Sequence, residues 1–94
     1  MKVKLLKSFS LQLADQVGYI AKDKPKAARQ FKKDILMTLE ILEKMPFLFR
    51  KSFHFQDENI RELTFKGYKI IYRVNVAKDT IQVFALLKYR KMNS

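Results

Sequence analysis

The spacing of apolar residues changes midway along this chain from a helical repeat to an alternating one. Between residues 11 and 45 the apolar side chains recur every three or four positions, as in an amphipathic α-helix. Between residues 63 and 76 they recur at every second position, as in a β-strand. A chain of 94 residues with these two patterns suits a single α+β domain over residues 1–94, with helices packed against a sheet.

The N-terminal part predicts a short strand followed by a helix. Val3 and Leu5 alternate with lysines, which is typical of a strand. A helix is then predicted over residues 11–23, and the hydroxyl of Ser8 or Ser10 can cap its start. The apolar stripe of this helix consists of Leu13, Ala14, Val17, Ile20 and Ala21.

A second, longer helix is predicted over residues 26–45. Pro25 suits the first turn of a helix, and the residue before Pro46 avoids helical geometry, so the two prolines bracket the segment. Its apolar face consists of Ala28, Phe31, Ile35, Leu39 and Leu42. The short link between the two predicted helices indicates an antiparallel helical hairpin.

Three further strands are predicted in the second half of the chain. Residues 46–58 have no clear period and indicate an irregular, aromatic connector. Residues 62–65 and 68–76 alternate on either side of Gly67, and residues 77–79 form a turn. The nearly continuous apolar run over residues 80–87 is typical of a strand buried on both faces, so we expect it inside the sheet.

The predicted architecture is therefore β-α-α-β-β-β, with the helical hairpin on one face of a small, mainly antiparallel sheet. The row that contains Tyr68, Tyr72 and Val74 is the more apolar one and is expected to face the helices. The row of Lys69 and Arg73, with Ile71 between them, is then expected to line an uncovered face. Both rows of the last strand are apolar, so its orientation stays open.

Charge and composition restrict the class of protein. Twenty Lys and Arg against nine Asp and Glu give a formal net charge of +11, which favours anionic partners. The chain has no cysteine, which excludes disulfides and thiolate metal sites. Since no apolar run approaches the roughly 18 residues that span a bilayer, we expect a cytoplasmic protein with no membrane partner.

The sequence offers few groups for conventional catalysis. A single histidine, His54, predicts no metal site, and no glycine-rich phosphate loop or cofactor motif is present. Cations and tyrosines on strands can instead bind phosphates and stack bases, or cleave RNA without a metal. For Lys69 and Arg73 the alternative is solvated charge on an open sheet face.

Two stretches resemble a known family. GYIAKDKPKAARQF over residues 18–31 and IRELTFKGYKIIYRV over residues 60–74 are similar to sequences of the RelE/ParE superfamily of toxins. The resemblance covers nearly the whole chain and implies the toxin component of a type II toxin–antitoxin system. It also implies a cognate acidic antitoxin that neutralises the toxin, and binding of operator DNA only through that antitoxin.

Toxic activity divides this superfamily between ParE-like inhibition of DNA gyrase and RelE-like cleavage of mRNA on the ribosome. The ribonuclease branch carries basic residues where this chain has Ile60 and Glu62, and an arginine where it has Lys69. Lys88 stands where many relatives carry a histidine. The resemblance therefore favours a non-enzymatic gyrase inhibitor, with a ribosome-dependent mRNA endoribonuclease and a non-toxic nucleic-acid-binding module as alternatives.

Two sets of candidate site residues follow from these observations. If the protein is a ribonuclease, the catalytic candidates are Lys69, Arg73, Arg90 and Lys91. The candidates for binding the target or the antitoxin are Arg61, Lys69, Arg73, Lys88, Tyr89, Arg90 and Lys91.

Overall fold

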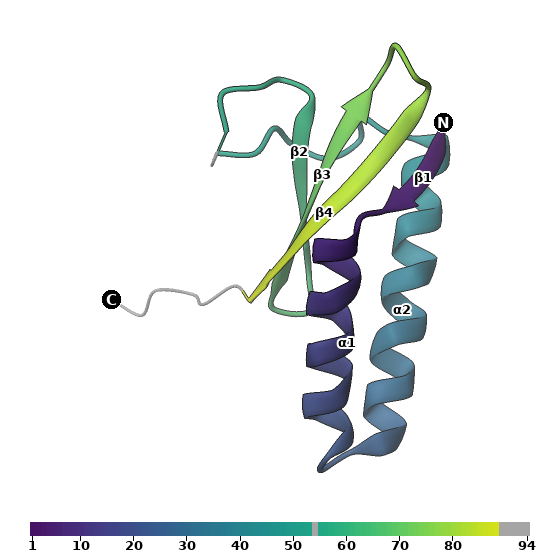
Figure 1. The fold of residues 1–94 in the computed structure, drawn as a ribbon, viewed down its shortest axis with the longest axis vertical. Helices are drawn as coiled ribbons and strands as arrows, with labels where there is room; N and C mark the ends of the chain where they lie inside the picture. Colours follow the sequence, from purple (N-terminus) through teal and green to yellow (C-terminus); the bar gives the residue numbers. More distant parts are fainter. Residues whose placement is uncertain (54, 89–94) are drawn as a thin grey trace.

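The chain folds in the predicted order β-α-α-β-β-β (Figure 1). The computed structural model describes residues 1–53 and 55–88, so the candidates Tyr89, Arg90 and Lys91 lie outside the described residues, as does His54. The elements are β1 (Lys2–Leu5), α1 (Lys7–Ala21), α2 (Pro25–Lys44), β2 (Ile60–Phe65), β3 (Tyr68–Asn75) and β4 (Thr80–Lys88). None of the helices in these ranges is long and apolar enough to span a membrane.

The described strands form one four-stranded mixed sheet in the order β1-β4-β3-β2. The pairs β2–β3 and β3–β4 are antiparallel, whereas β1 runs parallel to β4. The prediction that the last strand lies inside the sheet is confirmed, because β4 has a neighbour on each side. The parallel strands β1 and β4 are joined by a long connection that includes the α1–α2 hairpin, β2 and β3.

The two helices lie side by side, and their link is at the opposite end of the molecule from the β3–β4 turn (Figure 1). Pro25 occupies the first turn of α2, as predicted. The predicted serine cap of α1 is wrong, because the helix starts earlier, after Leu6, and has no side-chain cap. The hydroxyl of Ser8 instead donates a hydrogen bond to the carbonyl oxygen of Phe84, 2.6 Å away.

The core lies between the helical hairpin and one face of the sheet. It contains the predicted apolar row of β3 and the predicted face of α2 except Ala28, which is buried but not part of this cluster. Its buried side chains are Phe9, Leu13, Phe31, Ile35, Leu39, Leu42, Leu63, Tyr68, Ile70, Tyr72, Val74, Ile81, Val83 and Leu86. Burial raises the pKa of Tyr72 to about 12, and its hydroxyl donates to the carbonyl oxygen of Pro46 at 3.0 Å.

The second face of the sheet is not uncovered, which corrects a prediction. Ile71 is only 1% exposed there. The connector between α2 and β2 (residues 45–53 and 55–59) pairs with the outer edge of β2, where the amide of Ser52 donates to the carbonyl oxygen of Ile60. Its Phe55 ring packs edge-on against Phe84 of β4, with ring centroids 5.8 Å apart.

A tight turn joins β2 to β3 and is tied to α2. Lys66 and Gly67 have positive φ angles of 46° and 83°, as the two-residue turns that suit a twisted hairpin require. The ammonium of Lys66 lies 2.7 Å from the carboxylate of Asp34. This turn therefore connects the sheet to the middle of α2 through an ion pair.

Candidate functional site

The predicted site residues that the structure describes do not form one cluster. Lys69 lies opposite Thr64 of β2 and Leu87 of β4, and Arg73 lies four residues further along β3, roughly 13 Å away. Arg61 is paired with Tyr72 and so belongs to the other face of the sheet. Lys88 is the exposed last residue of β4.

Lys69 is held by a buried carboxylate. Its ammonium lies 3.3 Å from Glu62 Oε2, and its side chain is only 14% exposed. Glu62 also accepts hydrogen bonds from Ser52 Oγ at 2.8 Å and from Arg50 Nη2 at 2.9 Å. Burial alone would raise the pKa of Glu62, but the hydrogen bonds from Ser52, Arg50 and Lys69 outweigh it and lower the pKa. The result is a compact charged cluster rather than an open cationic surface.

Arg61 of β2 binds two backbone carbonyl groups of the connector. Its Nη1 donates to the carbonyl oxygen of Phe49 at 3.0 Å, and its Nε donates to the carbonyl oxygen of Glu58 at 3.1 Å. The guanidinium also lies over the ring of Phe47, 4.9 Å from its centroid.

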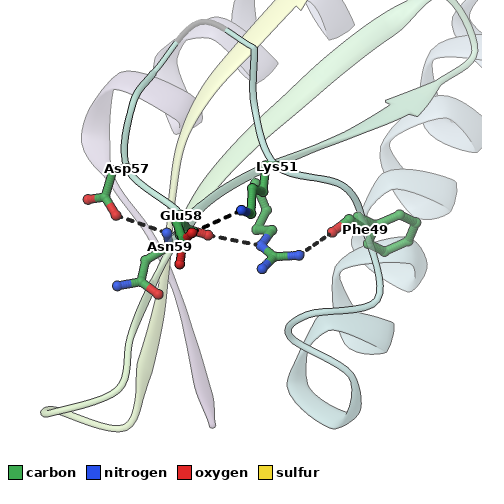
Figure 2. Close-up of polar contacts among 6 residues, drawn as sticks. Phe49, Lys51, Asp57, Glu58 and Asn59 are labelled. Atoms are coloured by element: carbon green, nitrogen blue, oxygen red, sulfur yellow. Dashed lines mark hydrogen bonds and ion pairs between the residues drawn. The ribbon is translucent and has the colours of Figure 1, made fainter.

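Two further contacts close the same loop (Figure 2). The ammonium of Lys51 lies 3.0 Å from the carboxylate of Glu58, and the amide of Asn59 donates to Asp57 Oδ1 at 2.9 Å. The hydrogen bonds of Arg61 thus belong to a set of contacts that hold the connector in its conformation.

Arg73 and Lys88 are the accessible members of the predicted set within the described residues. The side chain of Arg73 is 54% exposed, and its guanidinium lies 3.7 Å from the Asp57 carboxylate, at the limit of an ion pair. Both cations remain reachable by an anionic partner.

An apolar groove, which the sequence reasoning missed, lies between the two helices. Its volume is about 450 Å³, and its lining is mainly apolar. It is lined by Leu5, Ser10, Leu13, Ala14, Val17, Gly18, Lys32 and Leu36. Ala14 and Gly18, four positions apart on α1, are small and leave this space open. The spacing of these two small residues, one helical turn apart, was the only signal of the groove in the sequence.

The groove adjoins a row of exposed apolar side chains on α2. This outer row consists of Leu36, Met37 and Ile41 of α2 and of Met45, the residue that follows the helix, each between 40% and 55% exposed. Large apolar side chains gathered at a surface mark sites where proteins associate.

No candidate metal site is found within residues 1–53 and 55–88, because no three side chains of the types that bind metals lie together there.

Comparison with known proteins agrees with this fold. A model of the family described as "ParE toxin of type II toxin-antitoxin system, parDE" matches residues 3–92. The chain is similar to a solved structure titled "Chromosomal ParDE TA system from P. aeruginosa", with a TM-score of 0.79 and 16% identity over 96% of this chain and 97% of that one. A search of curated proteins gave no significant match. Since the family match extends over nearly the whole sequence, the chain belongs to the ParE toxin family of type II toxin–antitoxin systems.

Proposed function

We propose that this protein inhibits DNA gyrase by binding to it, without catalysing a reaction of its own. The observation that carries the proposal is membership of the ParE family, whose match extends over residues 3–92. In the RelE/ParE superfamily the toxin is the component that arrests growth, and gyrase inhibition distinguishes the ParE-like members from the RelE-like ribonucleases.

The environment of Lys69 supports a non-catalytic toxin. Metal-independent cleavage of RNA needs cations that stabilise the charge gathering on the phosphate in the transition state. The charge of Lys69 is already matched by Glu62, 3.3 Å away, and little of its side chain reaches solvent. The guanidinium of Arg73 lies 3.7 Å from the carboxylate of Asp57, so the charge of this second candidate is also partly matched.

We also propose that an acidic antitoxin neutralises the protein by covering the groove and the outer row of α2. Apolar side chains of the antitoxin would fill the groove, and its carboxylates would meet Lys32 at the groove wall. The net charge of +11 favours an acidic partner through long-range attraction. Mostly apolar lining next to basic residues thus suits an acidic, amphipathic segment.

A supercoiling assay tests the proposed target. Purified protein should inhibit gyrase in proportion to its concentration, and premixing it with its antitoxin should restore activity. Unchanged supercoiling, together with codon-dependent cleavage of mRNA on ribosomes, would overturn the proposal. In that case Lys69→Ala should abolish cleavage. Under the proposal, the wild-type protein itself does not cleave mRNA.

A further inference from the structure

The end of the helical hairpin carries a dense group of cations, of which the proposed function uses only Lys32. We call residues 22–33 the hairpin tip. It contains Lys22, Lys24, Lys26, Arg29, Lys32 and Lys33, with Asp23 as its only acidic residue. All six cations are exposed. Among the described residues, none of the six takes part in an ion pair.

The helical repeat places three of these cations on one face. Lys26, Arg29 and Lys33 are spaced by three and four residues, so they lie on the side of α2 opposite the buried Ala28 and Phe31. At 1.5 Å per residue they span roughly 10 Å along the helix. Lys22 and Lys24 belong to the link at the same end of the molecule (Figure 1). The tip therefore presents a continuous row of positive charge to solvent.

The composition of the tip distinguishes it from the surface proposed for the antitoxin. Large apolar side chains are exposed on α2 only from Leu36 onward, beyond the tip. Interfaces between proteins usually need such apolar anchors. A surface made almost entirely of cations instead suits a polyanion whose charges repeat along its length.

The aromatic content favours duplex over single-stranded nucleic acid. Readers of single strands stack successive bases on several aromatic side chains. Near the tip, Tyr19 is the exposed aromatic residue, at 68% exposure, in a shallow pocket with Lys22 and Lys24. Duplex DNA requires no stacking, since it presents about one phosphate charge per 1.7 Å of its axis.

We propose that the hairpin tip binds the phosphate backbone of duplex DNA without sequence preference. The inference rests on the tip alone and does not depend on gyrase being the target. It assigns the groove and the outer row to a protein and the cations of the tip to DNA. The two surfaces adjoin, because Arg29, Lys32 and Lys33 line the same open hollow as Leu36 and Met37.

Fluorescence anisotropy with a short labelled duplex of arbitrary sequence tests this proposal. Wild-type protein should bind at micromolar concentration in moderate salt, with the logarithm of the binding constant falling linearly with the logarithm of the salt concentration. The tip variant Lys26→Glu/Arg29→Glu/Lys33→Glu should lose at least about tenfold in affinity and flatten this slope by about 3.

The matched control is Lys2→Glu/Lys4→Glu/Lys78→Glu, which makes the same change in formal charge. These lysines are exposed on β1 and in the β3–β4 turn, at the other end of the molecule (Figure 1). The control should keep most of the affinity if the tip is the binding surface. Circular dichroism and thermal melting of both variants check that the fold is retained.

Several outcomes would overturn the proposal. Equal loss of DNA affinity in the two variants would mean that general charge, rather than the tip, attracts DNA. If the folded tip variant binds duplex DNA as tightly as the wild type, the tip is not the DNA-binding surface. Tighter binding of single-stranded RNA, or of anionic phospholipid vesicles, than of the duplex would assign the tip to a different partner. Loss of antitoxin binding in the tip variant, with DNA binding retained, would assign it to the antitoxin.

Discussion

Among single residues, Glu62 joins three segments of the chain: the connector, β2 and β3. Ser52 and Arg50 come from the connector and Lys69 from β3, and all three donate to the same buried carboxylate of β2. We expect Glu62→Gln to lower the free energy of unfolding by about 3 kcal/mol, because it leaves the charge of Lys69 without its counter-ion. Urea denaturation measures this loss.

The control for this prediction is the double variant Glu62→Gln/Lys69→Met. Removing the stranded charge as well should recover part of the lost stability, since an uncompensated charge costs more than a missing pair. If the double variant is as unstable as the sum of the two single variants, the two residues are not coupled.

The same carboxylate predicts how stability depends on pH. The pKa of Glu62 is lower in the folded protein than its ordinary value of 4.5, so the unfolded chain binds more protons in acid. The contribution of Glu62 is complete above about pH 5 and is lost as the pH falls through the folded pKa. Asp34, whose pKa is lowered by hydrogen bonds from Lys66 and Gln30, acts in the same direction. Unfolding followed from pH 7 to pH 3 should show a shallower acid loss in Glu62→Gln, and an unchanged profile would contradict this account.

Among the elements, the two glycines have opposite roles. Gly67 has a φ of 83° in the β2–β3 turn, whereas Gly18 lies within helix α1, and neither has any atom within 4 Å of an added Cβ. Gly67→Ala should therefore destabilise the fold by about 1 kcal/mol through backbone strain alone. Gly18→Ala should stabilise it by up to about 1 kcal/mol through helix propensity. Thermal melts of the two variants should shift in opposite directions, and shifts of the same sign would contradict the assigned conformations.

The groove predicts a specific effect on antitoxin binding. Leu36 is 40% exposed and lines the groove, so Leu36→Glu should weaken the complex by at least about tenfold by placing an acid against an acidic, apolar partner. Val76→Glu is the matched control, because Val76 is an exposed apolar residue in the β3–β4 turn. Isothermal titration of each variant with the antitoxin compares them, and an equal effect would exclude the groove.

Elements with a clear period could be predicted, and the connector could not. The faces of α2 and β3 and the interior position of β4 follow from apolar spacing, and the structure confirms them. The covered second face of the sheet depends on a segment without a period, whose contacts join residues far apart in sequence. For that reason the partners of Lys69 and the role of Arg61 in the connector were not apparent, and the serine cap of α1 was wrong. The groove depends on two small residues whose effect appears only once the helices are packed.

At the scale of the whole molecule, the net charge of +11 destabilises the folded state, because the positive charges repel one another. Salt should therefore stabilise the isolated protein: raising ionic strength from about 0.01 M to about 0.1 M shortens the screening length from about 30 Å to about 10 Å. We expect the melting temperature to rise by several degrees. The variant Lys2→Glu/Lys4→Glu/Lys78→Glu should show a smaller rise. A melting temperature that falls with salt would mean that attractive ion pairs, rather than repulsion, dominate.

The order of the strands also affects how the protein is made. β4 is the last of the described strands to be synthesised, yet it lies between β1 and β3. Ribosomes add about 5 to 20 residues per second, and domains fold as units. Until residue 88 has emerged, β1 has no complete strand with which to form hydrogen bonds, and it is not joined to the β2–β3 pair. The helical hairpin therefore emerges from the ribosome well before the sheet against which it packs is complete, so its apolar face stays without that partner until the last strand is made.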